Sequence, residues 1–199
     1  MKIVGLCGGS GSGKGAVGQL FEKHGVPVID TDAVYHELTS ARSECIDELV
    51  LAFGNSIIDE NGALNRPALG KIVFSSGASD KLQLLNKITH KHILLKTREM
   101  LGNFSERGFS MVVVDAPLLF ESEFNKECDI IVSVIADKNT RVERIMSRDK
   151  ISEDVARRRI ATQLGDDFLI ANSDFVIRND STLSELAEKF EILINDIKI

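Results

Sequence analysis

A glycine-rich segment near the amino terminus carries the clearest chemistry in this sequence. Glycines at positions 8 and 13, followed by Lys14, fit the spacing G-x-x-x-x-G-K. Glycine lets successive backbone N–H groups converge on an anion, and the positive end of a following helix and the lysine ammonium add charge at the same point. The pattern predicts a polyphosphate-binding loop, whose expected ligand-binding residues are Gly9, Gly11, Ser12, Gly13, Lys14, Gly15 and Ala16.

The residues after Lys14 depart from the usual form of this motif. A serine or threonine whose hydroxyl binds Mg²⁺ commonly follows the lysine, but Gly15 and Ala16 stand here. We therefore expect Mg²⁺ to be held mainly by water and nucleotide oxygens, which suits its reluctance to shed its hydration shell.

A second candidate is Asp115, which ends the apolar run 111–114. Four apolar residues followed by an aspartate is a form in which the carboxylate orients Mg²⁺ or its bound water. The alternative is that Asp115 only caps the next element. Because the hydroxyl after the lysine is missing, Asp115 is the residue expected to meet the metal, through water.

Two further carboxylates, Asp30 and Asp32, follow a short apolar run at 26–29. Ligands of open α/β sheets bind outside the carboxyl ends of the strands, so both side chains are expected to face the same crevice as the glycine-rich loop. The alternative is helix capping, with Thr31 or Asp32 as the cap of a helix that begins near Ala33.

Basic residues are concentrated in one region of this acidic chain. Arg141, Arg144 and Arg148 fall on one face of a helix predicted at 139–149, and three more arginines follow at 157–159. Such a cluster suits a lid that closes on polyphosphate and stabilises the transferred group. Solvated charges paired with nearby acidic residues are the alternative for at least half of these arginines.

The elements that position these residues alternate between strand and helix. Apolar runs predict five strands separated by helices, which together indicate a parallel three-layer α/β fold. The predicted strands are 2–7, 26–29, 111–115, 129–136 and 174–177. From 37 to 108 helical periodicity dominates and predicts an inserted helical lobe, with one long helix at about 79–107 or two helices separated near His90.

Composition narrows the class of protein. The 199 residues are 43% hydrophobic and 27% charged, which is ordinary for a globular chain, and the net charge of −6 argues against nucleic-acid binding. Three scattered cysteines without metal or disulfide spacing indicate a reducing compartment, and no signal-peptide pattern or membrane-length apolar run is present. A cytoplasmic monomer or weak homo-oligomer without membrane partners is the expectation.

With these pieces assembled, the sequence resembles the dephospho-coenzyme A kinase family over nearly its full length. Each matching segment also occurs in many other proteins, but the order and spacing of the segments are distinctive. They are 8–14, 28–32, 64–66, 69–74, His90, Asp115 with 117–121, Arg144 with 148–149, 159–160 with Gln163, and Asp174 with 176–177 and Asn179. The departures are Gly15 and Ala16 for Ser-Thr, Lys91 where proline usually follows the histidine, and Arg141 where glutamine is usual.

The resemblance implies a P-loop kinase sheet of order 2-3-1-4-5 and ATP-dependent phosphorylation of the 3′-hydroxyl of dephospho-CoA, the last step of coenzyme A biosynthesis. ATP and dephospho-CoA are the implied substrates and Mg²⁺ the implied metal. The nucleotide-binding core is expected at 1–36 and 109–199, including a lid at about 138–170. The helical coenzyme A insertion is expected at 37–108.

Residue roles follow from the same resemblance. Asp32 is expected to be the general base, while Lys14, Arg144 and Arg148 stabilise the transferred phosphoryl group. Asn179 is expected beside the nucleotide and Asp115 beside the hydrated metal. The acceptor-binding residues are expected to be Asp32, Arg66, His90, Pro117, Leu118 and Glu121.

Two other functions compete with this interpretation. A nucleoside monophosphate kinase would share the sheet, loop and lid, but it would need a compact pocket for a base and one phosphate. A non-catalytic nucleotide-binding relative is suggested by the missing hydroxyls after Lys14, and it would bind nucleotide without turnover.

Overall fold

The computed structural model describes residues 1–75 and 77–198 of the chain. The chain divides into two compact units, Met1–Ile29 with Phe104–Ile199, here called the core unit, and Asp30–Asn103, here called the insertion unit. These divisions differ from the expected ones at 36/37 and 108/109. The reason at the first boundary is that one unbroken helix, α2 (Thr31–Ser40), follows directly after residue 30.

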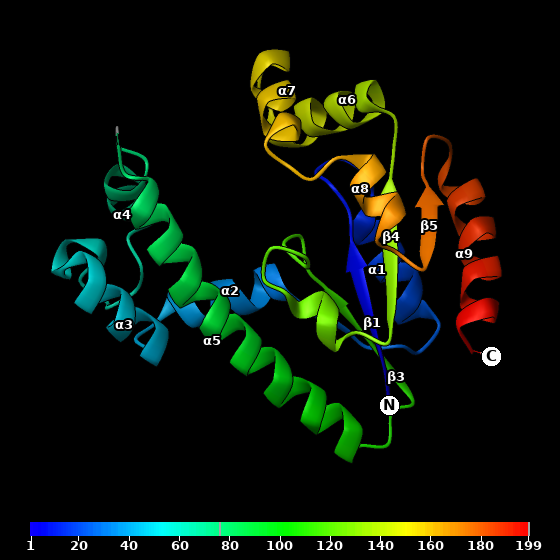
Figure 1. The fold of residues 1–199 in the computed structure, drawn as a ribbon, viewed down its shortest axis with the longest axis horizontal. Coiled ribbons are helices and arrows are strands. Elements are labelled where there is room, and N and C mark those ends of the chain that lie inside the picture. Colours follow the sequence, from blue (N-terminus) through cyan, green and yellow to red (C-terminus); the bar gives the residue numbers. More distant parts are fainter. Residues whose placement is uncertain (76, 199) are drawn as a thin grey trace. The chain divides into compact units, whose positions relative to one another are not determined.

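Five strands form one sheet of order β2-β3-β1-β4-β5, as predicted (Figure 1). The strands are β1 (Lys2–Cys7), β2 (Val28–Asp30), β3 (Met111–Asp115), β4 (Ile130–Ile135) and β5 (Phe175–Arg178). Strand β1 pairs in parallel with β3 on one side and with β4 on the other, so the loop that follows β1 leaves the middle of the sheet. That central position is where this fold class places its ligand.

One face of the sheet is covered by α1 (Lys14–Lys23) and α9 (Leu183–Lys198). Alternate strand residues point to this face because side chains of a strand alternate between its two sides. They pack in one cluster with residues of both helices, including Val4, Leu6, Val113, Val132, Val134, Val17, Phe21, Leu186 and Phe190. The rings of Phe21 and Phe190 lie edge to face with centroids 4.8 Å apart.

The connection from β3 to β4 packs directly on β1. A Cβ at Gly5 would lie 2.8 Å from the sulfur of Cys128 and 3.0 Å from a methyl of Leu119. Any other residue here would have to displace these side chains, so glycine allows the close approach. The connection, which includes the short 3-10 helix η2 (Phe124–Glu127), is thereby held against the sheet next to the carboxyl end of β3.

Three helices lie between β4 and β5: α6 (Lys138–Asp149), α7 (Glu153–Ala161) and α8 (Asp166–Ala171). The side chain of Asp137 accepts the N–H of Asn139 and caps α6. A small separate cluster of Val142, Ile145, Ala156 and Ile160 joins α6 to α7. The sequence predicted the first two of these helices but not α8, whose six residues are too few for a clear helical period.

The insertion unit is helical and has its own core. It contains α2, α3 (Glu44–Phe53), η1 (Asn55–Ile57), α4 (Arg66–Val73) and most of α5 (Ser79–Glu106). Its buried cluster includes Cys45, Ile46, Leu49, Ile57, Leu64, Leu69, Val73 and Ile88. Helix α5 is continuous over 28 residues, so it is not divided near His90.

Within the part of the chain that the structure describes, no helix has both the length and the apolar character that crossing a membrane requires.

Leu49 and Leu51 on α3 provide a test of the separate core of the insertion unit. Leu49 is fully buried, whereas Leu51 is 88% exposed. We expect Leu49→Ala to lower the free energy of unfolding of residues 30–103 by about 2–5 kcal/mol, because it leaves a cavity. The matched control Leu51→Ala is expected to change it by less than about 0.5 kcal/mol. Native-state hydrogen exchange measures both, and equal losses in the two variants would contradict the packing described here.

Candidate active site

The loop between β1 and α1 presents a row of backbone donors. Gly11 and Gly13 have φ of 80° and 93°, which residues with a side chain rarely adopt. In the described part of the chain, the N–H groups of Gly11, Gly13, Lys14 and Gly15 make no hydrogen bond. These donors lie at or beside the positive end of α1, where an anion is stabilised. The loop therefore has the character of the predicted polyphosphate site.

The carbonyl groups of the same loop are bound from within the protein. Asn179 Nδ2 donates to the Ser12 oxygen at 2.8 Å, and Arg141 Nε donates to the Ser10 oxygen at 3.0 Å. Arg144 Nη1 lies 3.3 Å from the Gly11 oxygen. Since these contacts satisfy the oxygens, the peptide groups are held with their acceptors toward the protein.

Asn179 is buried and acts on the loop itself. Its own N–H donates to the Ile135 oxygen at 2.8 Å, and its carbonyl oxygen accepts from Arg144 at 3.0 Å. A Cβ at Gly13 would lie 2.0 Å from Asn179 Nδ2, so the amide occupies the space that any other residue at position 13 would need. The structure places Asn179 against the phosphate loop; contact with a nucleotide base stays a prediction.

Lys14 and Asp115 come together as an ion pair between the side-chain ammonium and a carboxylate oxygen. The sheet register explains this contact, because Asp115 is the partner of Leu6 near the end of β1. Asp115 is only 7% exposed, and the Lys14 ammonium offsets the cost of burying its carboxylate. Gly15 follows on the exposed first turn of α1, and a Cβ there would meet nothing within 4 Å.

The donor set fits a metal that arrives with a polyphosphate. Among the described residues, no group of three or more His, Cys, Asp or Glu side chains forms a metal cage. Mg²⁺ is commonly held by one or two carboxylates together with phosphate oxygens and water, so such a cage is not required. Asp115 is the carboxylate at the loop that could meet the hydrated ion.

The two arginines expected to act in transfer occupy different positions. Arg144 is half-buried beneath the loop and bonds its carbonyls, as described above. Arg148 is exposed, with Nη2 3.4 Å from the Ser10 hydroxyl and Nε 2.7 Å from Asp149. Asp149 also pairs with Arg159. Its hydrogen bonds with Arg148 and then with Arg159 lower the pKa of Asp149 to about 2, so the carboxylate stays ionised further into the acidic range than an ordinary aspartate does.

Arg141 was not expected to have the role that the structure gives it. The sequence grouped it with Arg144 and Arg148 on one helix face, as part of a lid that closes on polyphosphate or, in the alternative, as solvated charge, but it is only 4% exposed. Its Nη2 donates to Gln163 Oε1 at 2.9 Å, and Nη1 lies 3.3 Å from Asp166. Burial lowers the pKa of Arg141, and the charge of Asp166 opposes this shift. The sequence held one signal of this role: Arg141 stands where the family that the sequence resembles usually has glutamine.

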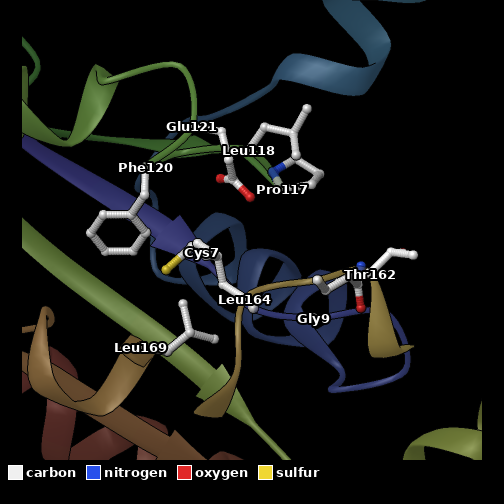
Figure 2. Close-up of a pocket in the computed structure, with 11 residues that line it drawn as sticks. Cys7, Gly9, Pro117, Leu118, Phe120, Glu121, Thr162, Leu164 and Leu169 are labelled. Atoms are coloured by element: carbon white, nitrogen blue, oxygen red, sulfur yellow. The ribbon is translucent and has the colours of Figure 1, made fainter. Parts of the chain in front are cut away.

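A pocket of about 260 Å³ adjoins the loop. Three predicted acceptor-binding residues, Pro117, Leu118 and Glu121, line it from the connection after β3. Figure 2 shows these residues grouped around the Cys7 end of β1. Its other lining residues, which the sequence did not single out for this role, are Cys7, Gly8, Phe120, Thr162, Gln163, Leu164 and Leu169, together with the loop residue Gly9.

The thiol of Cys7, which lines this pocket, is unreactive. Cys7 Sγ is 3.0 Å from the Ser133 hydroxyl, which is in turn 2.5 Å from that of Ser173. Burial raises the pKa of Cys7, so the thiol stays protonated at neutral pH.

The remaining predicted site residues belong to the insertion unit and are described within it. Asp32 is exposed in the first turn of α2, whose cap is Asp30: its side chain accepts the N–H groups of Asp32 and Ala33. The alternative that Thr31 or Asp32 caps this helix was wrong, because the helix starts directly after β2. Asp32 is therefore not used as the cap.

Arg66 and His90 lie on different helices of the insertion unit. Arg66 begins α4, and its guanidinium carbon lies 5.4 Å from the centre of the Tyr35 ring, over its face. Its Nη2 is also 3.4 Å from the Thr39 hydroxyl. His90 is half-buried on α5.

Comparisons with known proteins agree with this geometry. A family model described as dephospho-CoA kinase matches residues 2–185. A dephospho-CoA kinase of Oryza sativa subsp. japonica is 37% identical over 197 residues, covering 99% of this chain and 85% of the relative. One of Bacillus cereus (strain ATCC 10987 / NRS 248) is 34% identical over 197 residues, covering 99% and 98% respectively. The crystal structure of TT1252 from Thermus thermophilus has a TM-score of 0.80 and 27% identity, covering 98% of this chain and 97% of that one. With a match over nearly its whole length and the sheet order that the family implies, the chain belongs to the dephospho-CoA kinase family.

Proposed function

We propose that this protein transfers the γ-phosphoryl group of ATP to the 3′-hydroxyl of dephospho-CoA, giving CoA and ADP. The observation that carries the proposal is the row of open N–H donors at the start of α1, next to the Lys14 and Asp115 pair. Backbone donors and a lysine in this arrangement stabilise the phosphates of a nucleotide. Membership of the dephospho-CoA kinase family supports the identity of the acceptor.

Lys14 is the proposed partner of the ATP phosphates. In the structure its ammonium is bound to Asp115. With a triphosphate bound, Lys14 would contact its oxygens, and Asp115 would hold water molecules of a hydrated Mg²⁺. Mg²⁺ would supply positive charge that neutralises the transferred group. Arg148, which is exposed beside the loop, adds charge to that group, and Arg144 supports the loop from below.

Asp32 is the proposed general base, and its carboxylate accepts the proton of the ribose 3′-hydroxyl as the new P–O bond forms. Its exposure is consistent with access to an acceptor. Arg66 and His90 of the insertion unit, and Pro117, Leu118 and Glu121 of the pocket, are the proposed acceptor contacts. We also propose a cytoplasmic location. It is supported by the free cysteines Cys7, Cys45 and Cys128.

The first prediction from the proposed function concerns the identity of the acceptor. With ATP and Mg²⁺, we expect ADP formation to match CoA formation from dephospho-CoA, with little turnover of AMP, CMP, UMP or GMP. A coupled ADP assay with the five acceptors side by side, together with phosphorus NMR of the product, measures this. Turnover confined to a nucleoside monophosphate would replace the proposed acceptor, and binding of ATP without any turnover would indicate a non-catalytic relative.

The second prediction concerns the general base. Asp32→Asn is expected to lower kcat by about 10²-fold or more while ATP affinity is kept, because proton acceptance is lost and the phosphate loop is unchanged. Asp30→Asn is the matched control. Asparagine caps helices as well as aspartate does, so this variant removes a neighbouring charge at little cost to the helix. Steady-state rates and ATP calorimetry distinguish the two, and normal turnover of Asp32→Asn would exclude it as the base.

The third prediction concerns the loop backbone. Gly13→Ala is expected to weaken ATP binding at least about tenfold, because a Cβ collides with Asn179 and residue 13 has a left-handed backbone. The control Gly102→Ala makes the same change in α5. An added Cβ there would meet nothing within 4 Å, and φ is not in the left-handed region. That variant is expected to keep ATP affinity and to gain about 0.5–1 kcal/mol of stability. Unchanged ATP affinity in Gly13→Ala would show that the loop geometry is not needed.

A further inference from the structure

Arg141 joins three parts of the core unit through different nitrogen atoms. Nε donates to the Ser10 carbonyl of the phosphate loop, and Nη2 donates to Gln163 between α7 and α8. Nη1 faces Asp166 at the first residue of α8. A guanidinium can serve several acceptors at once because its donors lie in one rigid plane.

Both backbone polar groups of Ser10 are held by these side chains. Its N–H donates to Gln163 Oε1 at 2.9 Å, and the Ser10 carbonyl accepts from Arg141 at 3.0 Å. The bond from Arg141 to Gln163, also 2.9 Å, closes a ring of three hydrogen bonds. Each of the three residues is therefore bonded to both of the others.

The loop and Arg141 also fit each other sterically. A Cβ at Gly9 would lie 2.1 Å from Arg141 Nη2, and one at Gly11 would lie 2.6 Å from the Arg141 carbonyl oxygen. Gly11 is thus required both by the Arg141 backbone and by its own φ of 80°, whereas a side chain at position 9 would displace the Arg141 guanidinium. A shorter or more mobile side chain at 141 would leave this space unfilled.

Direct contact of Arg141 with phosphate is the competing explanation. It is disfavoured because the side chain is 5% exposed and each of its three nitrogen atoms already has an acceptor. Arg148, in contrast, is 60% exposed, which suits it better for contact with a ligand.

We propose that Arg141 is a positioning residue that locks the phosphate loop to the α7–α8 connection through Ser10 and Gln163, so that the loop is preformed for the β-phosphate common to ATP and ADP. The proposal rests on the proposed function only in that ATP is the bound nucleotide. It does not depend on the identity of the acceptor. Where the family that the sequence resembles usually has glutamine, this chain has a longer side chain that also reaches Asp166.

The test compares Arg141→Met, Arg141→Lys and Gln163→Met with Arg157→Met. Arg157 is the matched control, because it is a half-buried α7 arginine whose ion pair, with Glu153 at 2.7 Å, lies outside the ring. Calorimetry with ATP and with ADP gives the two Kd values. Hydrogen exchange reports on the backbone near Ser10 and at 162–165, and thermal unfolding verifies that each variant is folded.

A positioning role predicts that Arg141→Met weakens ATP and ADP equally, by about tenfold. Arg141→Lys is expected to resemble Arg141→Met, since an ammonium keeps the charge but cannot form the ring. Gln163→Met should match them, and the double variant should be no worse than either single one. Hydrogen exchange should become faster near Ser10 and at 162–165. The KM for ATP should rise with little change in kcat.

Other outcomes would overturn the proposal. Loss of ATP affinity alone, or wild-type behaviour of Arg141→Lys, would indicate a charge that contacts the γ-phosphate. Unchanged exchange near Ser10, or an Arg157→Met variant as weak as Arg141→Met, would show that the ring does not hold the loop. All of these measurements except kcat and KM need no acceptor, so a failure of the proposed dephospho-CoA activity would leave the test of Arg141 intact.

Discussion

The site depends on one constraint of the peptide group, which carries a donor and an acceptor on opposite sides. A loop that offers its N–H groups to an anion turns carbonyl oxygens back into the protein, and each buried oxygen then needs a donor. Asn179 and Arg144 supply donors to Ser12 and Gly11, while Arg141 supplies one to Ser10. The glycines therefore make the anion site possible, and side chains from distant parts of the chain make it stable.

The positive charges near the loop are also used largely within the protein. The chain as a whole carries a formal charge of −6, so an anionic substrate is attracted only by local cations. Several arginines between β4 and β5 are already bound to carboxylates or carbonyls, among them Arg141 with Asp166 and Arg159 with Asp149. Arg157 also pairs with Glu153 on the surface. A count of basic residues thus overstates the charge that is available to a ligand.

The sequence predicted those features that local pattern determines. The strands near Val4, Val113 and Val132 are continuous apolar runs, and a buried parallel sheet needs such runs. The glycine spacing likewise specified the loop. The apolar run ending in Asp115 predicted a carboxylate for the hydrated metal, which stays a prediction, but not the ion pair with Lys14 that the structure shows. What could not be predicted depends on contacts between distant residues. The burial of Arg141 requires Ser10 and Gln163 to meet, which no periodicity reveals, and the choice of Asp30 as the cap depended on where β2 stopped.

The hydrogen-bonded thiol of Cys7 has a consequence for the proposed acceptor, which ends in a thiol of its own. Thiol–disulfide exchange needs a thiolate as the attacking group, and burial keeps the sulfur of Cys7 in its unreactive form. Cys45 and Cys128 are similar, with pKa values raised by burial to about 11 and about 12. An enzyme whose substrate and product are thiols is in this way protected from forming mixed disulfides with the oxidised, disulfide forms of these compounds.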